Sequence, residues 1–107
     1  MDNDSGSLLI ALISLTGRVA FPPRSLYQIV CSRRGGPKQI KAYNLCDGTR
    51  TQAQIISECK LDAGNFSHTV SRWIESGVMF RLGSGREAKL LHLYPLPMRL
   101  PENVKAE

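Results

Sequence analysis

Residue types that often act in catalysis occur in this chain, but their spacing forms no catalytic or metal-binding motif. The two histidines, His68 and His92, have no second imidazole, thiol or carboxylate pair at a metal-ligand spacing. Ser67 and Ser71 share a predicted helix with His68, yet no adjacent carboxylate could orient the imidazole as a general base. We therefore expect no catalytic residues, no metal site and no cofactor, and a protein that is not an enzyme.

Three cysteines, Cys31, Cys46 and Cys59, are odd in number and more than ten residues apart. Such spacing does not match a zinc site. Buried reduced thiols are the favoured interpretation, because each cysteine lies among apolar neighbours. A redox sensor is the alternative, and it would need an exposed thiolate in a positive environment.

The N-terminal segment does not resemble a targeting sequence. It begins MDNDSGS, which is acidic where a secretory signal is basic. The apolar run at residues 8–15 is too short to cross a bilayer. We therefore expect a cytoplasmic protein without a membrane partner.

Positive charge is concentrated in the part of the chain before residue 51. The net charge is −2 over residues 1–17, +6 over 18–50, −1 over 51–77 and +2 over 78–107, which gives +5 for the whole chain. A basic balance favours a polyanionic partner. Gly35 and Gly36 lack the spacing of a phosphate-binding loop followed by Lys-Ser or Lys-Thr, so nucleotide binding is not expected.

Residues 51–77 carry the strongest pattern in the chain, which predicts two short helices joined by a polar turn. Thr51 and Gln54 have the spacing of a capping box, so the first helix begins there. Asp62 can cap the second helix, and Gly77 can end it. Apolar residues of the second helix recur at a period of 3.6 and predict its buried face: Phe66, Val70, Trp73 and Ile74.

The opposite face of the second helix is polar: Asn65, Ser67, His68, Ser71, Arg72 and Glu75. The segment GNFSHTVSRWIESG, followed at once by VMFRL, resembles the helix-turn-helix of winged-helix DNA-binding proteins, particularly small MarR-type and ArsR-type regulators. This resemblance covers roughly residues 38–94. It implies that the second helix enters the major groove of double-stranded DNA. The matching positions for contacts with base edges are Asn65, Ser67, His68, Ser71 and Arg72.

A β-hairpin is predicted directly after Gly77. Val78, Phe80 and Leu82 alternate with Met79 and Arg81, which indicates a strand whose first set of side chains is buried. A turn at residues 83–87 leads to a returning strand at 88–94. The resemblance implies that residues 78–94 form the wing. It also implies that Arg81, Arg86 and Lys89 contact the DNA backbone. An ordinary solvated hairpin is the alternative.

Five basic residues precede the helix-turn-helix and are candidates for phosphate contacts. They are Arg33, Arg34, Lys38, Lys41 and Arg50. Arg33 and Arg34 begin a break at residues 33–37, for which a solvated loop is the alternative interpretation. A short helix is predicted before this break, with Leu26, Ile29 and Val30 on one face, and another after it, closed by Asp47 and Gly48.

An apolar helix is predicted at about residues 6–16, capped by Ser5 or Ser7 and stopped at Gly17. Its apolar residues nearly surround it: Leu8, Leu9, Ile10, Leu12, Ile13 and Leu15. A patch of this size is uncommon on the surface of a monomer. We expect the helix to hold a homodimer, which would place two recognition helices on one DNA face. The alternative is that it forms the centre of the monomer's own core.

Together these patterns predict a mainly α protein with a small β-hairpin, an α+β winged helix-turn-helix with about five helices and a two-stranded wing. Residues 1–95 are expected to form a single domain, and residues 96–107 a flexible C-terminal tail. The expected function is sequence-specific binding of double-stranded DNA, as a transcriptional regulator. The alternative is a winged-helix adaptor that binds a protein partner and not DNA, because the helix-turn-helix itself is not basic.

Overall fold

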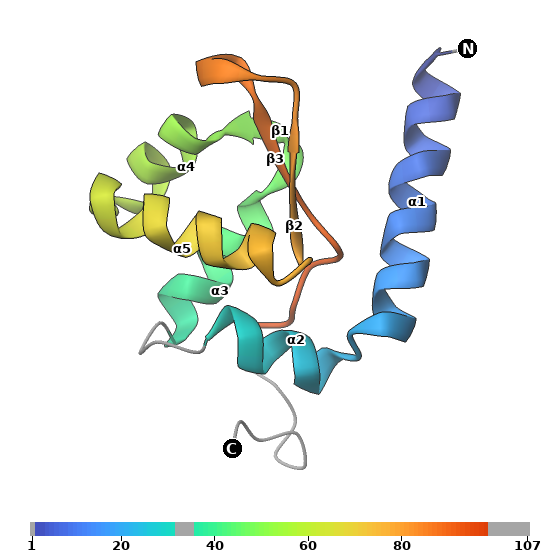
Figure 1. Cartoon of the computed structure of the whole chain (residues 1–107), viewed down its shortest axis with the longest axis horizontal. Helices are drawn as coiled ribbons and strands as arrows, with labels where there is room; N and C mark the ends of the chain where they lie inside the picture. Colours follow the sequence, from blue (N-terminus) through green and yellow to red (C-terminus); the bar gives the residue numbers. More distant parts are fainter. Residues whose placement is uncertain (1, 32–35, 99–107) are drawn as a thin grey trace.

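Five helices and a small antiparallel sheet make up the chain (Figure 1). The computed structural model describes residues 2–31 and 36–98. The elements in order are α1 (Asp2–Ala20), α2 (Pro23–Val30), α3 (Gly36–Leu45), β1 (Asp47–Thr51), α4 (Gln52–Cys59), α5 (Ala63–Glu75), β2 (Met79–Leu82), a short 3-10 turn η1 (Gly85–Glu87) and β3 (Lys89–His92). The expected combination of helices with a small β element is confirmed.

The sheet has three strands, so the expectation of two strands is wrong. The strand order is β1-β3-β2, and both pairs are antiparallel. The helix that the sequence predicts to close at Asp47 and Gly48 ends at Leu45, and Asp47 begins β1. The sequence DGTRT has no alternation of apolar and polar residues, so only its pairing with β3 identifies it as a strand. The His92 amide also donates to the Cys46 carbonyl at 2.6 Å.

Hydrogen bonds between side chains and the backbone fix the starts of α4 and α5. Thr51 Oγ1 accepts from the Gln54 amide at 3.2 Å, and Gln54 Oε1 accepts from the Thr51 amide at 2.8 Å, which confirms the capping box. Asp62 Oδ2 accepts from the Asn65 amide at 2.9 Å and caps α5. Gly77 has a φ of +83° just after α5, as expected for a helix-ending glycine.

The hydrophobic core lies between the helices and one face of the sheet. Tyr43 is at its centre and is fully buried. Its hydroxyl donates to the Val78 carbonyl at 2.8 Å and accepts from the Leu93 amide at 3.2 Å. Its ring meets the Trp73 ring edge to face, with centroids 5.2 Å apart. Tyr43 therefore links α3 to α5 and to both arms of the hairpin.

Strand β2 presents the opposite face from the one expected. Met79 is buried, whereas Phe80 and Leu82 are 39 % and 41 % exposed. Met79 packs with Leu90 in the core, while Phe80 pairs with Leu91 on the outer face of the sheet. Because successive side chains of a strand alternate between faces, burial of Met79 places Phe80 and Leu82 outside. Val78, just before β2, is buried as expected, but within the strand the expected inward positions of Phe80 and Leu82 are wrong.

Helix α1 is longer than expected and stands apart from the core. It runs from Asp2 to Ala20, so Gly17 lies within the helix and does not end it. It stands on the opposite side of the sheet from α4 and α5 (Figure 1). Most of its large apolar side chains are exposed. The interpretation that this helix forms the centre of the monomer's core is therefore wrong.

Contacts near the C-terminal end of α1 attach it to the rest of the molecule. Gly17 is buried against Leu93. The Arg18 guanidinium lies 4.3 Å from the centroid of the Tyr94 ring, and the Tyr94 hydroxyl donates to the Phe21 carbonyl at 2.6 Å. Across the described residues, no single helix could span a bilayer; only α1 and α2 taken together reach the required length and hydropathy, with a bend of 94° between them.

The chain remains packed beyond Tyr94. Leu96 is buried, and its backbone is held by Asn44 through two hydrogen bonds. Asn44 Nδ2 donates to the Leu96 carbonyl at 2.7 Å, and Asn44 Oδ1 accepts from the Leu96 amide at 2.8 Å. The packed structure thus continues past the expected boundary at residue 95. Most of the expected tail, residues 99–107, lies outside the described residues.

Candidate nucleic-acid interface

Helix α5 separates an apolar face from a polar face as its sequence predicts. Phe66, Val70 and Trp73 are buried in the core. Four of the five candidate base-contacting residues are exposed on the other side: Asn65, Ser67, His68 and Ser71. Their side chains can donate and accept hydrogen bonds, which is the chemistry needed to distinguish base edges. The buried face holds this polar surface in a fixed orientation.

Arg72, the fifth candidate, differs from the other four because it is partly buried. Its Nη2 lies 3.5 Å from Thr69 Oγ1, which donates to the Asn65 carbonyl at 3.0 Å. The guanidinium therefore lies along the helix toward its N-terminal half. Arg72 is the only lysine or arginine in α5, so the positive charge of this face depends on one side chain.

The hairpin places two of its three candidate residues at an open cavity of about 570 Å³ between α4 and the turn. Arg81 and Arg86 line it from the hairpin, with Ala88 and Leu90. The remaining lining residues are Gln52, Ala53, Ile56 and Gly85. Ala53 is exposed at the start of α4. Lys89 is partly buried and lies on the opposite face of the sheet from Leu90.

These guanidinium groups can bind anionic oxygens, including DNA phosphates. The sequence identified Arg81 and Arg86 as candidates but not Gln52. Gln52 is the first residue of α4, and the capping pattern that predicts this helix does not show that the hairpin lies beside it.

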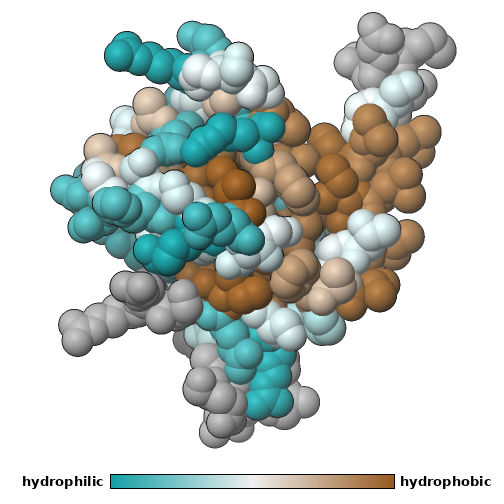
Figure 2. All heavy atoms as spheres, in the orientation of Figure 1, coloured by the Kyte–Doolittle hydropathy of each residue, from teal (hydrophilic) through white to brown (hydrophobic). Residues whose placement is uncertain are grey.

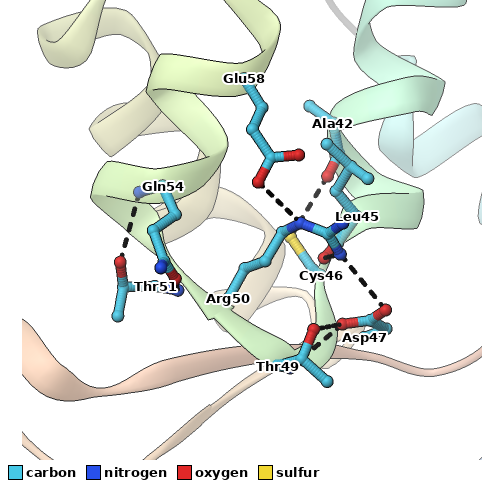
Figure 3. A network of polar contacts seen from close by, with 9 residues as sticks. All are labelled: Ala42, Leu45, Cys46, Asp47, Thr49, Arg50, Thr51, Gln54 and Glu58. Carbon is cyan, nitrogen blue, oxygen red and sulfur yellow. Dashed lines mark hydrogen bonds and ion pairs between the residues drawn. The ribbon is translucent and has the colours of Figure 1, made fainter.

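Arg50, another candidate for a phosphate contact, is engaged in ion pairs within the chain (Figure 3). Its Nε donates to Glu58 Oε2 at 2.9 Å, and its Nη1 lies 3.4 Å from Asp47 Oδ2. These contacts connect β1 to α4. A phosphate would have to compete with Glu58 for this guanidinium, so Arg50 is a weaker candidate than its charge alone indicates.

Asp47 is also held by its neighbours in the same network. Partial burial acts to raise the pKa of its carboxyl, but hydrogen bonds from Thr49 and the charge of Arg50 outweigh that effect and lower the pKa. Asp47 therefore stays ionised and keeps Arg50 oriented along β1.

The remaining basic candidates are not gathered at the hairpin. Lys38 and Lys41 are exposed on α3. In Figure 1, the first turn of α3 and the 3-10 turn of the hairpin lie at opposite ends of the helical body. Arg33 and Arg34 lie outside the described residues. The described basic side chains thus form separate groups and not one continuous strip.

Environments of the cysteines do not favour a reactive thiolate. Cys46 and Cys59 are buried, and Cys31 is partly buried. Burial raises the pKa of the Cys31 thiol and of the Cys46 thiol, whereas a redox sensor needs a lowered pKa. In the part of the chain that the structure describes, no group of histidine, cysteine or carboxylate side chains could hold a metal ion.

The surface divides into a hydrophilic side and a hydrophobic side (Figure 2). Hydrophilic side chains gather over α4 and α5, and hydrophobic side chains gather over α1. No protein-family model, curated protein or solved structure matches the chain.

Proposed function

We propose that this chain is a winged-helix protein that binds double-stranded DNA, with α5 in the major groove and the β2–β3 hairpin as the wing. The order of elements from α3 onward supports this assignment: helix, strand, helix, helix, strand, strand. A helix directly precedes the helix-turn-helix, and a hairpin directly follows it, as in the family that the sequence resembles. The third strand, β1, pairs with β3 and joins the wing to the body.

The observation that carries the proposal is the exposed polar face of α5. Asn65, Ser67, His68 and Ser71 are all exposed, while the other side of the same helix is buried around Trp73. A recognition helix needs this division, because its buried side fixes the orientation in which its exposed side meets the bases. An asparagine can pair with adenine through two hydrogen bonds, and an arginine can pair in the same way with guanine.

Contacts with the DNA backbone are assigned to the hairpin. Arg81 and Arg86 are exposed, and Lys89 follows them at the start of β3. Phosphate contacts supply affinity that does not depend on sequence, and each one adds to the salt dependence of binding. The hairpin would thus position the protein on the DNA backbone, while α5 would recognise the base sequence.

Selection of preferred duplexes from a random pool, followed by salt titration of binding, tests the proposal. Asn65→Ala and Arg72→Ala should each relax the preference at one or two base pairs and cost about 1–3 kcal/mol of binding free energy. Glu75→Ala is the matched control, because Glu75 is exposed on the same helix but lies in its last turn. This control should return the wild-type motif.

The same duplexes test the role of the hairpin. Arg81→Glu combined with Arg86→Glu, both at exposed positions, should weaken binding to every duplex and reduce the salt slope by roughly one unit for each lost phosphate contact. Base preference should persist in this variant. If Asn65→Ala and Arg72→Ala both keep the wild-type motif, the assignment of α5 as the recognition helix is wrong.

A second candidate function is that of an adaptor that binds a protein partner. It is favoured by the single cation of α5, Arg72, whose guanidinium is partly buried. Little affinity for any duplex, together with tight binding to one protein partner, would support this second function over the first.

A further inference from the structure

Helix α1 carries a row of leucine and valine side chains that points away from the molecule. Leu8, Leu12, Leu15 and Val19 follow one another at intervals of four, three and four residues. Their exposed fractions are 66 %, 55 %, 63 % and 79 %, so each loses less than half of its surface to the chain. We call these four residues the outer seam of α1. Alternating steps of three and four residues keep side chains on one line along a helix.

The opposite side of α1 is the side that packs against the body. With about 3.6 residues per turn, Ile10, Ile13 and Gly17 lie roughly half a turn away from the outer seam. Ile13 is partly buried against the core, and Gly17 is buried against Leu93. The helix therefore has two apolar sides, of which the inner one is occupied and the outer one is open. Figure 2 shows hydrophobic side chains over the exposed part of α1.

We propose that the outer seam binds the outer seam of a second copy of this chain, so that two α1 helices pair around a two-fold axis. Spacing of this kind is that of the a and d positions of a two-helix coiled coil, in which apolar side chains of each helix fill spaces on the other. A two-fold interface uses one self-complementary surface on both partners, and a single row of similar side chains meets that requirement.

A lipid surface is the other occupant that such a helix could have, and the composition of α1 argues against it. Helices that lie on membranes commonly carry lysine and arginine on their polar side. Between Ser5 and Gly17, α1 has no charged residue, and the side opposite the seam packs against the protein. A protein partner with a matching apolar row is therefore the better fit, and the chain itself supplies one.

Charge favours an antiparallel arrangement of the two helices. Arg18 lies in the last turn of α1, and the sequence ahead of Ser5 contains two aspartates and no lysine or arginine. An axis midway between Leu12 and Leu15 would place Leu8 against Val19 of the second copy and Leu12 against Leu15. Each acidic end would then run toward the basic end of its partner, and the two helix dipoles would oppose each other.

The attachment of α1 to the body makes the seam a fixed surface. Contacts of Gly17 with Leu93 and of Arg18 with Tyr94 hold the C-terminal half of the helix. Pairing would therefore require little reordering of the chain, which lowers its entropic cost. This proposal does not depend on DNA binding, because α1 lies on the opposite side of the sheet from α5 (Figure 1).

Sedimentation equilibrium in the absence of DNA tests the pairing. Four seam residues from each copy make a small interface, so we expect a dimer with a dissociation constant on the order of 10 μM. Leu12→Glu combined with Leu15→Glu should give a monomer with an unchanged helix content, because both side chains are exposed. Ser7→Glu combined with Ser25→Glu is the matched control, since it adds the same charge at exposed positions off the seam and should remain dimeric.

Two outcomes would overturn the proposal. One is a wild-type chain that stays monomeric up to about 100 μM, well above the expected dissociation constant. The other is a seam variant that dimerises as well as the control. Binding of monomeric wild type to anionic lipid vesicles would assign the seam to a membrane surface, which also contradicts pairing.

Disulfide cross-linking tests the direction of the helices and does not require a seam variant that adds charge. Leu12→Cys and Leu15→Cys are prepared separately, each combined with Cys31→Ser to remove the partly exposed native thiol. Antiparallel pairing predicts that a mixture of the two oxidises to a mixed dimer faster than either variant alone, because position 12 faces position 15. Faster cross-linking of each variant with itself would show a parallel pair and contradict the arrangement. Absence of all cross-links would contradict the interface.

Discussion

His92 is the residue whose setting has the clearest consequence for stability. It is 8 % exposed, its ring lies 5.5 Å from that of Tyr43, and its Nδ1 has no hydrogen-bond partner within the described part of the chain. Burial lowers the pKa of the imidazole, and weaker effects of the Asp47 charge and nearby backbone groups act in the opposite direction. His92 is therefore a residue of the predicted returning strand that packs in the body, and it is neutral when the chain is folded at pH 7.

This lowered pKa predicts that the chain loses stability as the pH falls below about 6.5, the ordinary value for histidine. Above that pH the imidazole is neutral in both the folded and the unfolded chain, so His92 contributes no pH dependence to the free energy of unfolding. Below it, the unfolded chain binds the proton before the folded chain does, and unfolding becomes more favourable. Between pH 7.5 and 5.5 we expect the free energy of unfolding to fall, by no more than the roughly 1.4 kcal/mol that one proton can contribute over the pH unit below 6.5; urea denaturation measures the change.

His92→Leu should remove most of this pH dependence. Asp47 does not contribute in this range, because its pKa lies below an ordinary value of 3.8. His68→Gln is the matched control, since His68 is the other histidine and is exposed on α5. A His92→Leu variant with the same pH dependence as the wild type would show that another group is responsible.

At the scale of the element, α1 contains two glycines in different environments that test how the helix is attached. A Cβ atom at Gly17 would lie 2.9 Å from Leu93 Cβ and 3.3 Å from Leu93 Cδ2, whereas one at Gly6 would meet no atom within 4 Å. Alanine favours a helix over glycine by up to about 1 kcal/mol, so Gly6→Ala should be stabilising or neutral. Gly17→Ala should be destabilising by about 1–3 kcal/mol, because overpacking outweighs the helix preference.

Thermal unfolding of the two glycine variants, followed by circular dichroism, measures this difference. Equal stabilisation by both would mean that α1 does not pack on Leu93. The contact between α1 and the hairpin would then have to be abandoned, together with the fixed position of the outer seam.

Local sequence signals predicted the elements whose ends are fixed by neighbouring residues. The capping box of Thr51 and Gln54, the Asp62 cap and the Gly77 turn all occur where expected, because each depends on residues only a few positions apart. The polar face of α5 follows from the same local pattern. Its role in DNA binding stays a prediction.

Features that depend on distant partners could not be predicted in this way. Strand β1 exists through pairing with β3, some forty residues later in the chain. The outward position of Phe80 depends on which face of the sheet the core covers. The sequence predicts that Gly17 ends the helix, yet Gly17 lies within α1 and allows the helix to approach Leu93 closely. In each case long-range packing overrides the local pattern.

At the scale of the whole molecule, the two proposed surfaces lie on opposite sides of the sheet. α5 offers polar groups on one side, and α1 offers its apolar seam on the other (Figure 1). A dimer formed through α1 would leave both α5 helices uncovered. Each copy could then contact DNA while the pair determines the distance between the two contacts.

If both proposals hold, the preferred DNA site is an inverted repeat, because two-fold symmetry of the protein is matched by two-fold symmetry of the site. For recognition helices on one face of the duplex, the half-sites should lie roughly 10 base pairs apart, centre to centre. Duplexes with one half-site, with two half-sites at this spacing and with a spacing longer by about half a helical turn distinguish this arrangement. The wild type should bind the correctly spaced pair most tightly. Leu12→Glu with Leu15→Glu should bind all three with the affinity of a single half-site, since it keeps α5 but cannot pair. A wild-type chain that binds the single half-site as tightly as the pair would show that the two copies do not act together on DNA.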